Sequence, residues 1–148
     1  MDDETLTRSV RDGVGALSST LRQRFAEPSS SGQGFVALAT LRHLRRQGPR
    51  TITSLAASDR VTTQAISLRI RSLEEAGLVV RDRDPDDGRR TVVTPTEAGI
   101  GVLDEAERRT DDALRTAVSR LSRTDRSALQ RAMPVLEALA ADLAGAAS

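Results

Sequence analysis

Arginine carries the clearest chemical signal in this chain, because every basic side chain other than His43 is an arginine. The arginines are unevenly spread. Between Leu41 and Arg71 the only acidic residue is Asp59, whereas the basic residues are Arg42, Arg45, Arg46, Arg50, Arg60, Arg69 and Arg71. From Glu97 to Asp112 the balance reverses in favour of acidic residues. This segregation predicts one face that binds an anion and one that does not. The alternative, arginine as the ordinary solvated residue, explains the absence of lysine but not the segregation.

The residues needed for enzymatic or metal chemistry do not occur in usable patterns. The chain has no cysteine, and one histidine cannot complete a catalytic triad without a matching nucleophile or a zinc site without cysteine. His43 is therefore expected to be a solvated surface residue. Asp84, Asp86 and Asp87 alternate as in a calcium loop but lack the remaining ligands, and no glycine-rich phosphate motif occurs. We predict that the chain is not an enzyme and uses no cofactor and no metal.

Two predicted helices separated by a short break lie in the middle of the chain. The first begins near Ile52, where Thr51 or Thr53 can cap it. The second ends at Gly77, because glycine enters the left-handed conformation at the least cost. The apolar face of this second helix comprises Val61, Ala65, Ile66, Ile70 and Leu73.

Two β-prone runs follow, at 78–83 and 90–94. The segment Asp84–Gly88 between them contains Pro, Asp and Gly, which favour a hairpin turn with a charged tip. Helix, turn, helix and hairpin is the order of a winged helix-turn-helix, which is a DNA-binding arrangement.

Long amphipathic helices are predicted on both sides of this segment. One runs from 3 to 26 and another from 33 to 47, with a Ser-rich loop over 27–32. Thr96 should cap a helix that reaches Leu121, and Ser122 should open a last helix that Pro134 kinks or interrupts. The winged head is too small to cover the apolar faces of these helices, which predicts pairing with a second copy. We expect a single unit over 1–148, with a DNA-binding head at 33–95 and dimerisation helices at 3–26 and 96–145.

The order of elements and three motifs resemble the MarR family of bacterial transcription regulators. The motifs are Leu73-Glu74-x-x-Gly77-Leu78-Val79, then Asp87-x-Arg89 in the hairpin, then Thr96-x-x-Gly99 at the next helix. The resemblance spans nearly the whole chain. It implies a symmetric dimer that places a recognition helix of each subunit in the major groove and each wing tip near the minor groove. Many members of the family lose DNA affinity when a small, often phenolic, molecule binds between the head and the dimerisation helices.

The DNA-contacting residues are predicted from the polar side of the recognition helix and from the wing tip. They are Thr62, Thr63, Gln64, Ser67, Leu68, Arg71, Asp87, Arg89 and Arg90. Gln64 can pair with adenine. By resemblance, Arg89 matches the family arginine that enters the minor groove, and Asp87 matches the residue that braces it. The alternative is an ordinary amphipathic helix and a charged hairpin without DNA contact.

Two positions depart from the family pattern. Leu68 stands where a basic contact is common, so it either touches a thymine methyl or leaves that base pair unread. Arg69 would then extend from the edge of the apolar face towards solvent. Pro95 stands where leucine is common, and it should stiffen the joint between the wing and the next helix.

Two further surfaces are predicted. The dimer interface is expected to comprise Leu6, Val10, Val14, Leu129, Met133, Leu136, Leu139 and Leu143. Family resemblance, with the need for a cation beside a carboxylate, predicts a site for a small apolar acid where the first two helices meet the helix after Thr96. The residues assigned to it are Phe25, Phe35, Arg42, His43 and Arg46. The alternative is that these arginines serve only DNA phosphates or solvent.

The sequence therefore predicts a mainly α-helical protein with a small β-hairpin wing. We predict a homodimeric repressor that binds double-stranded DNA at an inverted-repeat operator. Whether a small aromatic or phenolic ligand releases the protein from DNA is left open. A ligand-independent structural DNA-binding protein and a protein-interaction module on the same fold are the alternatives. No apolar run approaches the length of a membrane span, and the acidic N-terminus does not fit a signal peptide. We expect no membrane contact and a cytoplasmic, nucleoid-associated location.

Overall fold

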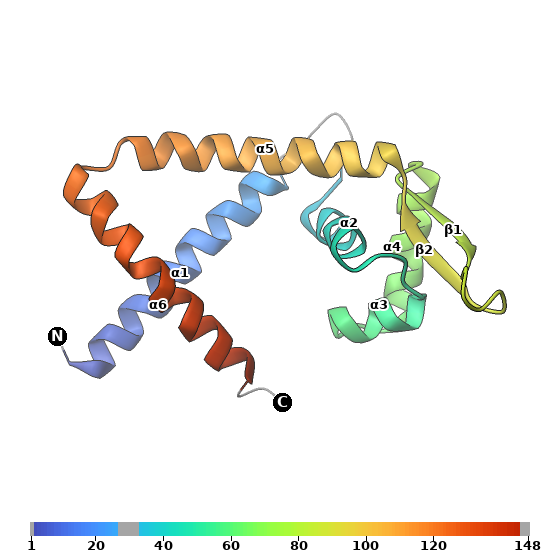
Figure 1. Ribbon diagram of the computed structural model, residues 1–148, viewed down its shortest axis with the longest axis horizontal. Helices are drawn as coiled ribbons and strands as arrows, with labels where there is room; N and C mark the ends of the chain where they lie inside the picture. The colour runs from blue at the N-terminus through green and yellow to red at the C-terminus, as the bar shows by residue number, and fades with distance from the viewer. Residues whose placement is uncertain (1, 27–32, 146–148) are drawn as a thin grey trace. The chain divides into compact units, whose positions relative to one another are not determined.

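A computed structural model describes residues 2–26 and 33–145, and it has the predicted mainly helical architecture with one β-hairpin (Figure 1). Its elements are α1 (Asp3–Phe25), α2 (Phe35–Gln47), α3 (Ile52–Asp59), α4 (Thr63–Glu75), β1 (Val79–Arg83), β2 (Thr91–Pro95), α5 (Glu97–Ser119) and α6 (Arg123–Gly145). The loop predicted at 27–32 lies outside the described residues. The chain divides into two compact units, Met1–Thr110 and Asp111–Ser148, and α5 passes from one into the other. None of the helices in the described part is long and apolar enough to cross a membrane.

The helices of the first unit begin and end at the local signals that the sequence provides. Thr51 caps α3 by accepting a hydrogen bond from the backbone N of Ser54 at 3.1 Å. Thr62 caps α4 in the same way. After α4, Gly77 has a φ of +73°, which is the left-handed conformation predicted for it. Arg60 also adopts a positive φ, of +53°, and turns the chain between α3 and α4.

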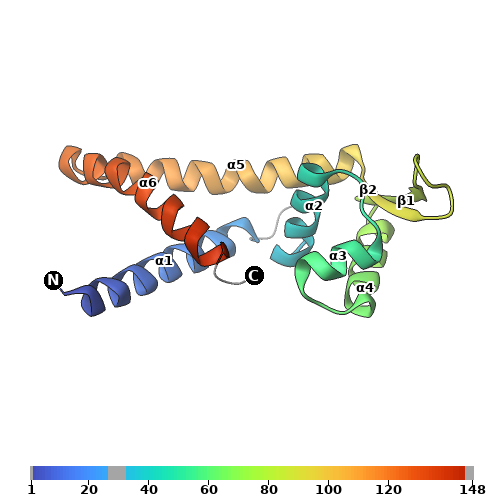
Figure 2. The same cartoon turned by 60° about the horizontal axis from the view of Figure 1, so that its bottom comes forward.

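The core of the first unit is almost entirely aliphatic. Helices α2, α3 and α4 lie next to one another (Figure 2). Together with the first part of α5 they contribute most of the fully buried side chains, which include Leu38, Leu41, Leu44, Leu55, Ile66, Ile70, Leu73 and Leu103. Val61 and Ala65 were predicted for the buried face of α4, but both are exposed. Val61 precedes the first residue of α4, so helical spacing does not extend to it, and Ala65 lies at the border of the buried face.

The wing, defined here as β1, β2 and the tip between them, is an antiparallel hairpin. Val79 pairs with Pro95 at its base, and Arg83 pairs with Thr91 near its tip. Each strand begins one residue later than predicted. The backbone of Arg50 adds a bridge to Val93, with N–O distances of 3.2 and 2.7 Å, and thereby ties the segment before α3 to the wing.

The joint between the wing and α5 depends on the Thr96-x-x-Gly99 motif. The Thr96 hydroxyl accepts a hydrogen bond from the backbone N of Gly99 at 3.0 Å and donates one to the carbonyl O of Gly77 at 2.7 Å. The backbone N of Thr96 donates to the carbonyl O of Leu78 at 3.0 Å. A Cβ at position 99 would overlap that same carbonyl oxygen. Glycine is required here because the start of α5 approaches the backbone of Leu78, the residue before β1, this closely.

We expect Gly99→Ala to lower the free energy of unfolding by about 1–3 kcal/mol, because the added Cβ must push the backbone at Leu78 away. Gly101→Ala is the matched control. It lies in the same helix with nothing within 4 Å of the added Cβ. Its helix propensity should raise stability by up to about 1 kcal/mol. Chemical denaturation followed by circular dichroism measures both, and equal stability of the two variants would contradict this account.

The second unit contains the end of α5 and the whole of α6. Ser122 opens α6 as predicted, since its hydroxyl accepts from the backbone N of Asp125 at 3.0 Å and donates to the carboxylate of Asp125 at 2.7 Å. Leu121, predicted to lie in the preceding helix, follows its end. The predicted interruption at Pro134 is wrong, because α6 continues through it. The carbonyl of Gln130 that loses its partner lies on an exposed residue, where water can bond it.

Candidate nucleic-acid interface

The outward side of α4 carries the residues that could read bases. With about 100° per residue, Gln64, Leu68 and Arg71 lie within about 60° of one another. This stripe is on the side opposite the three buried residues of the helix. All three side chains are exposed, and Leu68 is 60% exposed. The helix therefore presents an amide, an apolar group and a guanidinium in one row.

The other predicted residues of this helix lie beside that row. Thr63 is exposed and Ser67 is half-buried. The Thr62 side-chain oxygen accepts a hydrogen bond from the backbone N of Ala65 at 3.1 Å, so it serves first as the helix cap.

Arg69 is held inside the protein instead of extending towards solvent as predicted. Its Nη1 donates to the carboxylate of Asp59 at 2.6 Å and to the hydroxyl of Thr40 at 3.2 Å. The side chain is only 18% exposed. The ion pair joins α4 to the end of α3, and the hydrogen bond to Thr40 joins α4 to α2. Together they remove one arginine from the outward side of α4.

The tip of the wing is shaped by backbone hydrogen bonds. The backbone N of Asp84 donates to the carbonyl O of Arg90, and the backbone N of Arg90 donates to the carbonyl O of Asp87, both at 2.9 Å. The Asp87 carboxylate accepts from the backbone N of Arg89 at 3.1 Å. Asp87 thus braces the backbone at Arg89. Across the part of the chain that the structure describes, neither the Arg89 nor the Arg90 guanidinium forms an ion pair, and both residues are exposed.

Two arginines of the basic segment noted in the sequence pair with residues of the acidic segment. Arg42 Nε lies 3.0 Å from the Glu107 carboxylate. Arg45 pairs with Glu107 at 2.7 Å and with Asp104 at 2.9 Å. The prediction of a free anion-binding face is therefore wrong for this part of α2, because these charges join α2 to α5. Arg46, the residue after Arg45, is exposed.

Glu107 is the centre of this network. Partial burial raises the pKa of its carboxyl, but hydrogen bonds from Arg45 and Arg42 outweigh that effect and hold the pKa below the ordinary value. The hydrogen bonding that Arg45 donates to Glu107 also raises the pKa of Arg45. The carboxylate form therefore stabilises the fold above the unfolded-state pKa of about 4.3, and this contribution is lost as the pH falls through the lower folded-state pKa.

We expect Glu107→Gln to cost about 1–3 kcal/mol of stability near neutral pH, since the charge-assisted hydrogen bonds from two arginines are weakened. The difference from wild type should shrink as the pH is lowered below about 4.3. Asp112→Asn is the control, because its pair with Arg115 is well exposed and should contribute little. Thermal melts from neutral to acid pH measure this, and a difference that does not depend on pH would refute the assignment.

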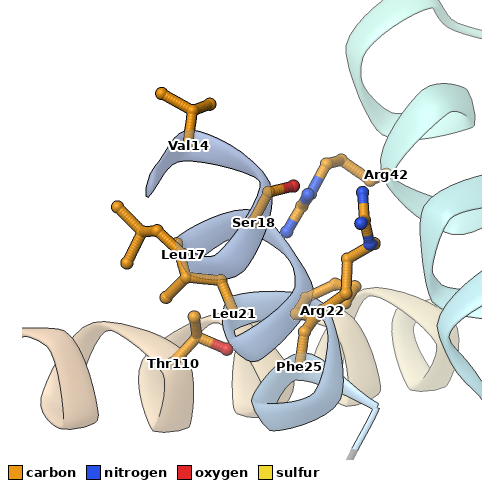
Figure 3. Close-up of a pocket in the computed structure, with 8 residues that line it drawn as sticks. All are labelled: Val14, Leu17, Ser18, Leu21, Arg22, Phe25, Arg42 and Thr110. Atoms are coloured by element: carbon orange, nitrogen blue, oxygen red, sulfur yellow. The ribbon is translucent and has the colours of Figure 1, made fainter. Parts of the chain in front are cut away.

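A cavity of about 410 Å³ lies beside this network, within the first unit (Figure 3). Its lining residues are Val14, Leu17, Ser18, Leu21, Arg22, Phe25, Arg42 and Thr110. The Arg42 guanidinium carbon lies 4.3 Å from the centre of the Phe25 ring, which in turn packs edge-to-face on Phe35 at 6.0 Å. The cavity thus has apolar walls from α1 and two guanidinium groups, Arg22 and Arg42.

The cavity overlaps only in part with the residues that the sequence assigned to a ligand site. Phe25 and Arg42 line it and Phe35 packs behind Phe25, whereas His43 and Arg46 are not among its lining residues. His43 is half-buried, and its Nε2 is buried without a hydrogen-bond partner in the described chain, so it is not the solvated residue predicted. Sequence reasoning missed the α1 residues because their apolar spacing was interpreted as a dimer surface.

Comparison with known proteins agrees with this geometry. The sequence profile of the MarR family matches residues 36–91. An HTH-type transcriptional regulator of Mycobacterium bovis is 31% identical over 137 residues, which cover 93% of this chain and 94% of the relative. Another, of Mycobacterium leprae, is 28% identical over 134 residues, with 90% and 92% covered.

Solved structures share the same fold. A Pseudomonas aeruginosa protein described as a transcriptional regulator has a TM-score of 0.78 and 29% identity, with 93% of this chain and 95% of the other covered. A MarR family protein of Bacillus stearothermophilus has a TM-score of 0.79 at 17% identity, with 95% and 99% covered. FabT of Streptococcus pneumoniae, solved in complex with DNA, has a TM-score of 0.69 at 13% identity, with 96% and 99% covered. The chain belongs to the MarR family of DNA-binding transcription regulators.

Proposed function

We propose that the protein is a homodimeric repressor that binds an inverted-repeat operator. Each subunit inserts α4 into the major groove and sets its wing tip against the minor groove. The observation that carries this proposal is the exposed row of Gln64, Leu68 and Arg71 on α4, together with a wing tip whose Arg89 forms no ion pair among the described residues. An amide and a guanidinium can bond base edges and phosphates, and a free guanidinium suits the negative potential of a narrow minor groove.

The proposal of a dimer is supported by apolar residues of α1 and α6 that are exposed to solvent in the single subunit. Leu6 and Val14 of α1 are 46% and 47% exposed, and Leu139 and Leu143 of α6 are 42% and 73% exposed. Within Arg123–Gly145 no residue is buried, although Leu and Met recur there at helical spacing. Helices of this kind are stabilised when a second copy covers their apolar faces. A two-fold axis then matches the symmetry of an inverted repeat.

Selection from a pool of random duplexes tests the proposal. We expect one inverted repeat whose half-site centres lie about one helical turn apart. In transcription reactions with a promoter that overlaps this repeat, added protein should lower transcript yield. Salt-sensitive binding without any sequence preference would instead identify a structural DNA-binding protein, and no salt-sensitive DNA binding would identify a protein-interaction module.

We also propose that the protein is released from DNA when a small aromatic acid binds in the cavity beside Phe25. The ring would lie against Leu17 and Leu21, and the carboxylate would bond Arg22 and Arg42. Arg42 already bonds Glu107 of α5 and stacks on Phe25 of α1. A ligand carboxylate would compete with Glu107 for Arg42, and it would thereby loosen the tie that holds α2 of the head to α5.

We expect Arg22→Gln to weaken binding of such an acid by about tenfold to a hundredfold, since one charge-assisted hydrogen bond is lost. Arg11→Gln is the matched control, because Arg11 lies on α1, outside the cavity, and pairs with Asp12. Calorimetric titration with a panel of aromatic carboxylic acids measures the effect. If the panel leaves the melting temperature and operator affinity of the wild type unchanged, the ligand part of the proposal fails.

A further inference from the structure

Leu68 occupies the middle of the outward side of α4, a position where an apolar side chain needs an explanation. It is 60% exposed, more than any other large apolar residue of the DNA-binding segment from α2 to the wing. Gln64 and Arg71 lie four residues before it and three residues after it, so one helical turn separates Leu68 from each polar neighbour. Nothing within the described subunit covers this side chain.

The structure also shows why the neighbouring arginine does not take over this position. Arg69 is turned to the flank of α4, where it is held by the carboxylate of Asp59 and the hydroxyl of Thr40. If Arg69 left this ion pair, the Asp59 carboxylate, which is 27% exposed, would lose its charged partner. The centre of the outward row is therefore apolar, and Arg69 cannot replace Leu68 there.

We propose that Leu68 reads a C5-methyl group, so that each operator half-site carries thymine at the base pair next to the one contacted by Gln64. In the major groove, the thymine methyl is the apolar group by which a base pair is distinguished. Contact between the thymine methyl and Leu68 removes both apolar groups from water. Cytosine would instead present an amino group, and leucine has no acceptor for its hydrogen bond. This inference rests on the proposed placement of α4 in the major groove, and it adds the chemical feature that the helix selects.

The test replaces each thymine of the selected operator by deoxyuridine, symmetrically in both half-sites, and measures binding of the full-length protein. At one position, loss of the methyl should weaken wild-type binding about fourfold per half-site and about fifteenfold for the pair. Leu68→Ala should bind the thymine and deoxyuridine duplexes equally at that position. A second pair of duplexes carries cytosine or 5-methylcytosine at the same position. The wild-type protein should bind the methylated duplex more tightly, and Leu68→Ala should bind both with equal affinity.

Gln64→Ala is the control variant, because it should keep the methyl sensitivity while losing discrimination at the adjacent base pair. Leu68→Ala should fold normally, since its side chain is exposed and alanine favours helix. If no thymine methyl affects wild-type binding, or if Leu68→Ala keeps the sensitivity, the inference is overturned while the regulator function stands. If selection yields no operator at all, the proposed function fails, and this inference fails with it.

Discussion

Leu139→Glu is expected to convert the protein into a monomer whose operator affinity has fallen by about 10²–10⁴-fold, because one head alone loses the second half-site. Leu139 is 42% exposed on α6, within the stripe that we assign to the dimer interface. A carboxylate placed in an apolar interface loses its hydration without gaining a partner, so the charged variant should not associate.

Ala138→Glu is the matched control for this substitution. It adds the same charge to the same helix, at an exposed position on the side away from the apolar stripe. It should remain a dimer with wild-type operator affinity. Light scattering at micromolar concentration gives the mass of each variant, and binding to whole and half operators gives the affinity. A wild-type protein that is a stable folded monomer under these conditions would contradict the assignment.

Features that depend on nearby residues could be predicted from the sequence. Thr51, Thr96 and Ser122 each accept a hydrogen bond from a backbone N three residues ahead, so the signal and its partner lie within one turn. Gly77 is predictable for a similar reason, because a positive φ is local to one residue. The bounds of the helices and strands accordingly differ from prediction by only a residue or two at most ends.

Features that depend on tertiary contacts could not be predicted. The bonds from Arg42 and Arg45 to Glu107 join residues more than sixty positions apart. Segregated charge in a sequence is equally consistent with binding an external anion and with pairing across two helices, and only packing decides between them. The buried Nε2 of His43 and the ion pair of Arg69 with Asp59 are hidden for the same reason. Gly99 was identified as part of a motif, but its close contact with the Leu78 carbonyl emerges only from the fold.

The contacts of α4 and the wing with DNA should separate into sequence choice and general affinity. Arg89 at the exposed wing tip is expected to act through the potential of the groove and through phosphate neutralisation, which do not depend on sequence. Gln64 is expected to act through base edges. Arg89→Ala should therefore weaken operator and scrambled duplex together. It should also reduce the slope of log affinity against log salt by about 0.9 per subunit, or about 1.8 per dimer.

Gln64→Ala should give the opposite pattern. Affinity for the operator should fall by about 1–3 kcal/mol per lost base contact, whereas affinity for the scrambled duplex and the salt slope should stay unchanged. Arg11→Gln removes a charge from α1 and serves as the control for a change in net charge alone. The measurement is a salt series for all variants on both duplexes. Equal weakening of both duplexes by Gln64→Ala, with no effect of Arg89→Ala on either, would show that base reading and phosphate contact have been assigned to the wrong elements.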